Sequence, residues 1–279
     1  MTDTAALLDD FSLEMTGKDV DDLRAAAPAT PAGTRINVTF LGNEDLPMRL
    51  NASRAVLEEG FVPVPHISAR RLRGQDELEQ FLAALQEAGA SENVFTVGGD
   101  PATPEGPYPD SATVIRTGIL PQYGVKHVSI AGYPEGHPDI PDEALWDALR
   151  AKNASLAEQG LSGTILTQFA FDEAPVLSWI EKVRDEGIDL PIRVGVPGPA
   201  GVKRLIGFAR RFGIGANAMI VKKYGFSLTN LIGTAGPDKL LGALADGYDP
   251  GRHGRVHLHF YTFGGLTATS QWIRDFRAR

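Results

Sequence analysis

Residues 126–138 read KHVSIAGYPEGHP, a short apolar run that ends in glycine, proline, an aromatic residue and two ionisable groups. Residues 164–172, TILTQFAFD, have the same character further along the chain. Each run is typical of a buried strand. Its ending is typical of a loop that carries functional side chains and does not pack into a core. The stretch between them has helical periodicity. These residues therefore predict a repeating unit of strand, polar loop and helix.

Eight runs of this kind occur along the chain, and most are nearly continuously apolar, as buried parallel strands are. They are Phe11–Met15, Arg35–Phe40, Val62–Ile67, Val94–Val97, His127–Ala131, Gly163–Phe169, Ile192–Val196 and Val256–Thr262. Eight strand and helix units in 279 residues favour an α/β fold, a single (β/α)8 TIM-barrel domain over residues 1–279. An open Rossmann-type sheet is the second choice, because no G-x-G-x-x-G follows a first strand.

Apolar residues at helical spacing lie between these runs, most clearly over residues 78–85 and 176–183. Both helices are expected to end at a left-handed glycine, Gly89 in the first and Gly187 in the second. The seventh unit is longer than the others. Val202–Ala245 holds several helical segments, so we expect extra helices before the last strand, as an insertion on a barrel loop.

The composition excludes several classes of protein. A net charge of −8 argues against nucleic acid as a partner, and the absence of cysteine excludes disulfides and zinc-thiolate sites. No apolar run reaches the roughly 20 residues that span a bilayer, and no secretory signal pattern opens the chain. We expect a soluble cytoplasmic protein that does not associate with membranes.

Polar residues follow nearly every predicted strand, and the carboxyl ends of barrel strands form the usual active-site rim. They are Glu14, Thr39, His66, Ser68, Asp100, Tyr133, Glu135, His137, Gln168, Asp172, His259, Tyr261 and Thr262. Glu14 lies in an otherwise apolar strand, where an acid is either paired structurally or used in catalysis. Asp100 could instead cap a turn, Gln168 could satisfy a buried backbone group, and His66 and His137 could be loop histidines. The tryptophans, in helical segments, are interpreted as packing residues.

The pair His257 and His259 shares one face of the last strand, so two imidazoles could bind a divalent ion. Barrel hydrolases that use such a pair back it with further histidines and acids. Here the first strand offers only Glu14. We therefore expect no metal site.

Four segments together resemble the methylenetetrahydrofolate reductase family, from about Phe11 to the end of the chain. They are FSLE at 11–14, the run at 126–138, TQFAFD at 167–172 and HFYT at 259–262. The resemblance implies a (β/α)8 barrel that carries FAD without a covalent bond. It also implies reduction of 5,10-methylenetetrahydrofolate to 5-methyltetrahydrofolate with NAD(P)H as donor, a step of one-carbon metabolism and methionine biosynthesis.

The resemblance assigns roles residue by residue. Glu14 matches the acid that protonates the folate at N10, and Asp100 matches an aspartate near flavin and pterin. Gln168 matches the glutamine used against the pterin, with Phe169 and Tyr261 beside the substrate. The positions that line the flavin or its phosphates are Thr39, His66, Gly99, Asp100, Ala131, Tyr133, His137, Asp147 and Lys152.

Three departures from the family pattern keep alternatives open. Gly98 stands where the family often has arginine, Gly264 and Gly265 where it often has Asn-Arg, and Val202 where it has an aromatic residue. The alternatives are another flavin-dependent one-carbon barrel enzyme, including one that runs the reaction in reverse, and a folate-binding or interaction protein that has lost the flavin. The sequence does not decide between NADH and NADPH as the donor. It also leaves open whether the chain forms a homo-oligomer.

Overall fold

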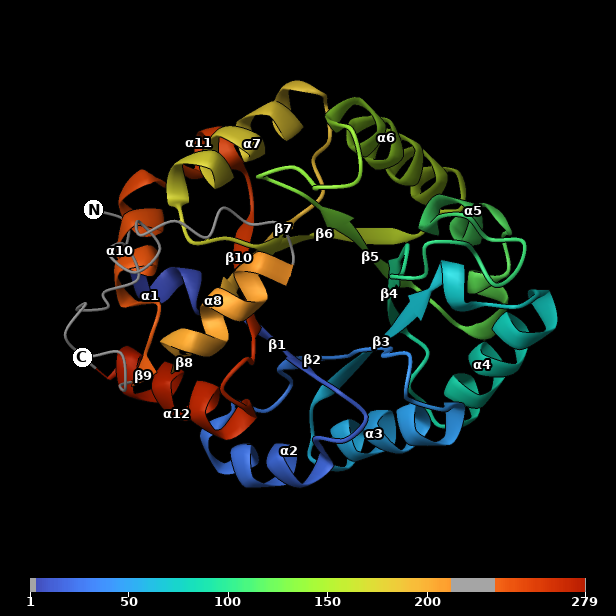
Figure 1. Ribbon diagram of the computed structural model, residues 1–279, viewed down its shortest axis with the longest axis horizontal. Helices are drawn as coiled ribbons and strands as arrows, with labels where there is room; N and C mark the ends of the chain where they lie inside the picture. Colours follow the sequence, from blue (N-terminus) through green and yellow to red (C-terminus); the bar gives the residue numbers. More distant parts are fainter. Residues whose placement is uncertain (1–3, 212–233, 279) are drawn as a thin grey trace.

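The eight apolar runs form the eight parallel strands of a closed barrel in the computed structural model, which describes residues 4–211 and 234–278 (Figure 1). Around the barrel the strands follow the order β1-β10-β7-β6-β5-β4-β3-β2. Their bounds are β1 (Ser12–Met15), β2 (Arg35–Val38), β3 (Val62–Ser68), β4 (Asn93–Val97), β5 (His127–Gly132), β6 (Ser162–Phe169), β7 (Ile192–Pro197) and β10 (Val256–Tyr261). The predicted (β/α)8 barrel is confirmed.

Helices surround the barrel on its outside, and their ends follow local sequence signals. The longer ones are α2 (Val20–Ala26), α3 (Leu46–Glu58), α4 (Gln75–Glu87), α5 (Ser111–Arg116), α6 (Asp142–Glu158), α7 (Glu173–Asp185), α10 (Asp238–Gly247) and α12 (Leu266–Arg277). The short ones are α1 (Thr4–Leu7), α11 (Pro250–His253) and the 3₁₀ turns Ala27–Ala29, Ala69–Arg71 and Leu120–Tyr123. Gly89 and Gly187 both have a φ of 73°, which confirms the predicted left-handed helix ends. Within the described ranges, no helix has the length and apolar character needed to cross a membrane.

The predicted insertion begins with α8 (Val202–Arg211), which follows β7 and packs near the barrel mouth (Figure 1). The short strands β8 (Ala200–Gly201) and β9 (Thr234–Ala235) pair antiparallel on either side of it. α8, α10 and α11 all lie between β7 and the last strand, as expected; residues 212–233 of the predicted insertion lie outside the described residues. The buried face of α8 packs in one cluster with Phe169 and Phe171.

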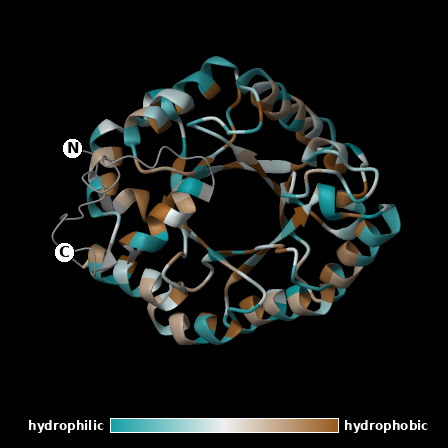
Figure 2. Ribbon diagram, in the orientation of Figure 1, coloured by the Kyte–Doolittle hydropathy of each residue, from teal (hydrophilic) through white to brown (hydrophobic). Residues whose placement is uncertain are grey.

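The apolar core lies between the strands and the helices rather than inside the barrel. Leu13, Met15, Ile36 and Val38 face outward from β1 and β2 and are fully or almost fully buried in that layer. Figure 2 shows the same division, with hydrophobic residues on the barrel side of the helices and hydrophilic ones on their outer faces. The alternate residues of each strand point inward, and many of them are polar.

The amino-terminal end of the barrel holds an ion-pair network around the buried guanidinium of Arg193. The Asp10 carboxylate accepts hydrogen bonds from Arg35 Nη1 at 2.8 Å and from Arg193 Nη2 at 2.7 Å. Arg193 is only 5% exposed, so its charge depends on this partner. His257 Nε2 lies 4.0 Å from the same carboxylate. This network lies at the opposite end of the strands from the polar rim that the sequence predicts.

Candidate active site

Glu14 and His259 meet at the carboxyl ends of the neighbouring strands β1 and β10. The register pairs Ser12 with His259, so all three side chains lie inside the barrel. His259 is fully buried, and its Nδ1 lies 2.9 Å from Ser12 Oγ. Its Nε2 lies 3.7 Å from Glu14 Oε2, and the Glu14 side chain is 20% exposed. Burial lowers the pKa of His259 even though Glu14 opposes this, so the imidazole is neutral beside the carboxyl group.

His66, at the end of β3, brings a second neutral imidazole to the same place. Its Nε2 lies 3.4 Å from Asn37 Nδ2, and its ring packs edge-to-face on Phe95 at 4.7 Å. Burial lowers the pKa of His66 to about 4; the nearby Glu14 opposes the shift and His259 adds to it. Glu14 thus shares its surroundings with two imidazoles, neither of which carries a charge at neutral pH.

His127, the first residue of β5 and so at the amino-terminal end of the barrel, is held neutral in a related way. Ser162 Oγ donates to the Lys126 carbonyl at 2.8 Å and lies 3.0 Å from His127 Nδ1, so this nitrogen carries the proton. His127 Nε2 then accepts from Thr164 Oγ1 at 2.9 Å. Burial, followed by the charges of nearby Arg35 and Arg193, lowers the pKa of His127 to about 4.

The free energy of unfolding should therefore fall as the pH drops from about 6.5 to about 4. In this pH range His66 and His127 bind protons in the unfolded chain but not in the folded protein. Above this range the two histidines contribute no pH dependence. Each can add a slope of up to about 1.4 kcal/mol per pH unit. Urea unfolding of the wild type and of His127→Asn across this range measures the effect. An equal slope in the two proteins would contradict the role of His127.

Tyr261 and Phe169 form the aromatic wall of the mouth. The Tyr261 ring lies 5.3 Å from that of Phe169 and 5.0 Å from that of His259, and its hydroxyl donates to the Thr167 carbonyl at 3.1 Å. Burial raises the pKa of Tyr261 well above its ordinary value, so the phenol stays protonated. Gln168 Oε1 accepts from the backbone N–H of Phe169 at 3.1 Å, which is the structural role that the sequence left open for it.

The absence of a side chain at Gly195 of β7 allows this packing. β6 shifts its register against β7 between Leu166 and Phe169, and the Gly195 N–H donates to Thr167 Oγ1 at 2.8 Å. A Cβ at residue 195 would lie 2.6 Å from the Thr167 carbonyl oxygen and 2.8 Å from Tyr261 Cε2. The tyrosine ring therefore occupies space that only glycine leaves free.

Thr39 and Asp100 lie on the same rim, at the ends of β2 and β4. Thr39 is 9% exposed, and its buried hydroxyl has no hydrogen-bond partner within the described residues. Asp100 Oδ1 accepts from Arg71 Nε at 2.9 Å and Nη2 at 2.5 Å, with the aspartate side chain 69% exposed. Gly99, with a φ of +95°, turns the chain between β4 and Asp100. Asp100 is thus one half of a surface ion pair rather than the cap of a turn.

The residues expected along β5 and α6 do not all converge. Tyr133 and His137 pack edge-to-face at 5.5 Å in the loop after β5. Lys152 is buried, and its Nζ donates to the Ala131 carbonyl at 3.2 Å; burial lowers its pKa to about 8. Asp147 is 69% exposed and accepts from Arg150 at 3.0 Å instead. Lys152 and Asp147 therefore point away from one another on α6.

Three residues that support this site escaped the sequence reasoning: Ser12, Asn37 and Arg71. Ser12 lies two residues before Glu14 and so shares its face of β1, and Asn37 likewise faces inward from β2. Because successive side chains of a strand point to opposite faces, the sequence would have indicated that Ser12 and Asn37 both point into the barrel. Arg71 belongs to the basic run 70–73, which resembles a solvated loop in the sequence.

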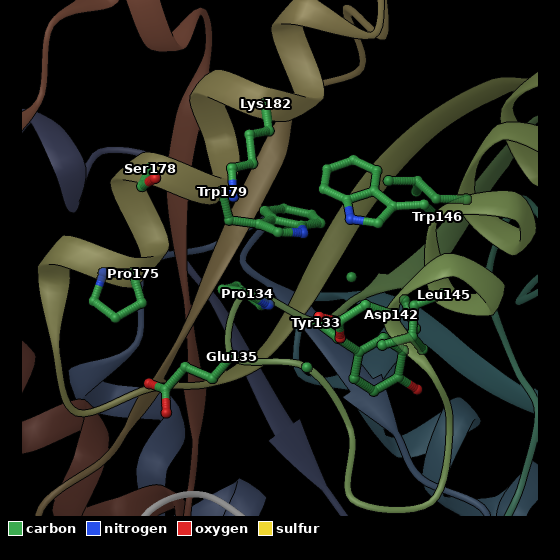
Figure 3. Close-up of a pocket in the computed structure, with 14 residues that line it drawn as sticks. Tyr133, Pro134, Glu135, Asp142, Leu145, Trp146, Pro175, Ser178, Trp179 and Lys182 are labelled. Carbon is green, nitrogen blue, oxygen red and sulfur yellow. The ribbon is translucent and has the colours of Figure 1, made fainter.

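A pocket of about 330 Å³ lies beside this rim, between α6 and α7 (Figure 3). The loop after β5 forms its floor, and Trp146 and Trp179 line it from the two helices with ring centroids 5.9 Å apart. Both tryptophans lie in helices and pack against the core, as expected for packing residues. They also give the pocket a broad aromatic wall. In the described part of the chain, no group of three or more His, Cys, Asp or Glu residues could hold a metal ion.

The sequence of the chain is similar to known proteins. The sequence profile of the family "Methylenetetrahydrofolate reductase" matches residues 30–231, more than half of the chain. Methylenetetrahydrofolate reductase 2 of Saccharomyces cerevisiae is 30% identical over 138 residues, which cover 46% of this chain and 22% of the yeast protein. The 5,10-methylenetetrahydrofolate reductase of Pectobacterium carotovorum subsp. carotovorum is 27% identical over 176 residues, 62% of this chain and 57% of that protein. The matches thus span less than two thirds of either relative.

Among solved structures, the dihydropteroate synthase (FolP) of Thermus thermophilus superposes with a TM-score of 0.49 and 16% identity, over 97% of this chain and 94% of that one.

Proposed function

The chain belongs to the methylenetetrahydrofolate reductase family, and from this premise we propose that it is a flavin-dependent oxidoreductase. The reaction proposed is reduction of 5,10-methylenetetrahydrofolate to 5-methyltetrahydrofolate with NAD(P)H as donor. The observation that carries the proposal is the position of Glu14. It lies at the barrel mouth, 20% exposed, beside the neutral imidazoles of His259 and His66, and it makes no ion pair with a lysine or arginine of the described residues.

Glu14 supplies the proton that the first step needs. The methylene carbon of the substrate bridges N5 and N10, and protonation of N10 lets the C–N10 bond break with its electron pair remaining on nitrogen. The carbon is then an iminium at N5, which accepts a hydride to become the methyl group. A positioned carboxylic acid is an effective donor for such a nitrogen. Tyr261 and Phe169 provide the apolar wall against which a pterin ring can lie.

FAD, when bound, supplies the hydride. One residue expected at its ring side fits this use, because the buried Thr39 hydroxyl lacks a partner among the described residues. His66 and Tyr133 lie on the same rim. The residues expected at the phosphates fit less well, since Lys152 is bound to the Ala131 carbonyl and Asp147 to Arg150. The proposal that the chain binds FAD therefore rests on the ring side of the site, and above all on Thr39.

FAD uptake tests the proposal directly. Purified protein incubated with FAD and freed of excess should keep the flavin absorbance bands. Thr39→Val, which removes the unpartnered hydroxyl, should weaken FAD binding about tenfold, the equivalent of one hydrogen bond. The matched control is Thr34→Val at the opposite end of β2, where the hydroxyl donates to the Pro31 carbonyl at 2.7 Å. It should bind FAD as the wild type does.

A protein with a folded circular dichroism spectrum that takes up no flavin would refute the flavin-dependent assignment. If that protein still bound tetrahydrofolate, a folate-binding role without flavin would be favoured. Two observations agree with that second candidate. Residue 98 is glycine where the family often has arginine, and Lys152 donates its hydrogen bond to the Ala131 carbonyl. The direction of the reaction is tested separately, by oxidation of 5-methyltetrahydrofolate with an artificial acceptor.

A further inference from the structure

Ser12, His259 and Glu14 lie in a line inside the barrel that ends at the carboxyl group of Glu14. Ser12 Oγ lies 2.9 Å from His259 Nδ1, and on the other side of the ring His259 Nε2 lies 3.7 Å from Glu14 Oε2. The Nε2 atom is buried and has no hydrogen-bond partner among the described residues. Because a buried polar atom without a partner is costly, its position beside the Glu14 carboxyl group requires a physical reason.

The backbone on both sides of this line is fixed by two neighbouring strands. β1 and β10 pair in parallel, with Ser12 opposite His259 (Figure 1). Thr262, just after β10, donates a hydrogen bond from Oγ1 to the Glu14 carbonyl at 2.6 Å. Ser12 and His259 are buried, whereas the Glu14 side chain reaches the barrel mouth. A small rotation of the Glu14 side chain would therefore bring Oε2 within hydrogen-bond distance of an imidazole that stays in place.

The groups on either side of the imidazole determine where its proton lies. Burial keeps the pKa of His259 below its ordinary value, so the neutral ring has one N–H and one bare nitrogen. A bare Nε2 would repel the Glu14 carboxylate, whereas a protonated Nε2 would donate to it. The Ser12 hydroxyl can donate to Nδ1, and its oxygen makes no other hydrogen bond with the described residues. The arrangement that satisfies all three groups has Ser12 donating to Nδ1 and the proton of His259 on Nε2.

Two other polar side chains near Glu14 have partners elsewhere. The Tyr261 hydroxyl donates to a backbone carbonyl of β6 at 3.1 Å. His66 Nε2 lies 3.4 Å from Asn37 Nδ2. Among the described residues around Glu14, His259 thus supplies a ring nitrogen that has no partner of its own.

We propose that His259 is a positioning residue for the acid: its Nε2–H donates to Glu14 Oε2, and Ser12 selects the tautomer that allows this. The inference rests on the proposed function, in which Glu14 protonates N10 of the folate. With Oε2 occupied by the imidazole N–H, the acidic proton of Glu14 lies on Oε1. When this proton passes to N10, the electron pair of the O–H bond stays on the carboxylate, and the Nε2–H stabilises the new negative charge. His259 is fully buried and acts only through Glu14.

Nitrogen NMR of protein that contains isotope-labelled histidine reports the tautomer directly. Protonated and bare ring nitrogens differ widely in chemical shift, and the His259 signals are assigned by their absence from His259→Asn and His259→Gln. In the wild type at neutral pH, Nε2 of His259 should be protonated and Nδ1 bare. Ser12→Ala removes the donor at Nδ1, so part of the signal should change to the other tautomer. A wild-type ring protonated at Nδ1 would overturn the inference.

Stopped-flow measurement of the two half-reactions tests the effect on the acid. His259→Asn keeps an amide near the position of Nδ1, facing Ser12, but places no donor beside Glu14. The folate half-reaction should slow by about tenfold to a hundredfold, the equivalent of one hydrogen bond to a charged group, while flavin reduction stays nearly unchanged. His259→Gln, whose amide reaches the position of Nε2, should recover most of the rate. Ser12→Ala should slow the folate half-reaction by about threefold to tenfold.

The matched control is His257→Asn, two residues earlier on the same face of β10. His257 lies 4.0 Å from Asp10, at the amino-terminal end of the barrel. This variant should keep both half-reactions at wild-type rates. Circular dichroism and FAD uptake show whether each variant is folded. If His259→Asn does not fold, the smaller change Ser12→Ala decides.

The outcomes separate this inference from the proposed function. Equal losses in both half-reactions for His259→Asn and His259→Gln would make His259 a structural residue, and wild-type rates in His259→Asn or Ser12→Ala would leave it without a role. A wild-type protein that does not reduce the folate would refute the proposed function instead. The NMR measurement needs neither flavin nor folate, so it still decides whether Ser12, His259 and Glu14 are hydrogen-bonded as inferred.

Discussion

Replacement of Glu14 by glutamine is expected to slow hydride transfer to the folate by about 10² to 10⁴-fold, the range for loss of a positioned acid. Glutamine keeps the size and hydrogen-bonding capacity of the side chain but cannot deliver a proton. In the proposed reaction, reduction of the flavin by the nicotinamide donor involves no proton at N10, so the rate of that half-reaction should stay nearly unchanged. Stopped-flow measurement of the two half-reactions separates them.

A buried carboxylate near the same rim provides the matched control. Glu44, 6% exposed, accepts hydrogen bonds from the backbone N–H of Gly17 at 2.8 Å and of Leu41 at 2.9 Å, and so fixes two loops of the same rim. Glu44→Gln should lower stability and impair both half-reactions together. If Glu14→Gln behaved in the same way, with equal losses in both halves, Glu14 would be a structural residue.

Asp10→Ala should lower the free energy of unfolding by about 3 kcal/mol, the lower end of the range for removing one partner of a buried ion pair. The loss leaves the guanidinium of Arg193, 5% exposed, without its carboxylate. Asp10 itself is 44% exposed at its side chain, which is why the lower end applies. Urea denaturation of the wild type and the variant measures the difference.

The neighbouring residue supplies the control for this effect. Asp9 is 72% exposed and pairs with Arg277 at 3.4 Å, so Asp9→Ala should change stability by less than about 1 kcal/mol. Adding Arg193→Met to Asp10→Ala should recover part of the loss, because the double variant removes the buried guanidinium charge. A loss no larger than that of Asp9→Ala would show that the network contributes little.

The sequence predicts the barrel well because buried parallel strands have a local signature. All eight apolar runs became strands whose ends shifted by only one or two residues, as from Gly163–Phe169 to Ser162–Phe169. Glu14, His66 and Tyr261 could be placed together for the same reason: the fold brings all strand ends to one rim. The residue at the end of each strand can be identified from the local sequence, and closure of the barrel brings these residues together.

Other features depend on contacts that no short stretch of sequence encodes. The ion pair of Arg71 and Asp100 joins two loops 29 residues apart, and the charge of the run 70–73 gave no sign of a partner. The directions of Asp147 and Lys152 depend on the rotation of α6 about its axis, which is set by packing against β5 and β6. The pocket between α6 and α7 exists only because those two helices flank the glycine-containing loop after β5.

The missing side chain at Gly195 limits how this barrel can be altered in the laboratory. The atoms that a Cβ would meet first belong to the backbone of β6, which cannot rotate away as a side-chain tip can. A saturation library across β7 should therefore return glycine at residue 195 from every active clone, while outward-facing Val194 and Val196 accept other apolar residues. Attempts to reshape the mouth for a different substrate have to begin at Phe169 or in α8, because Gly195, the inward-facing residue at the centre of β7, cannot be replaced.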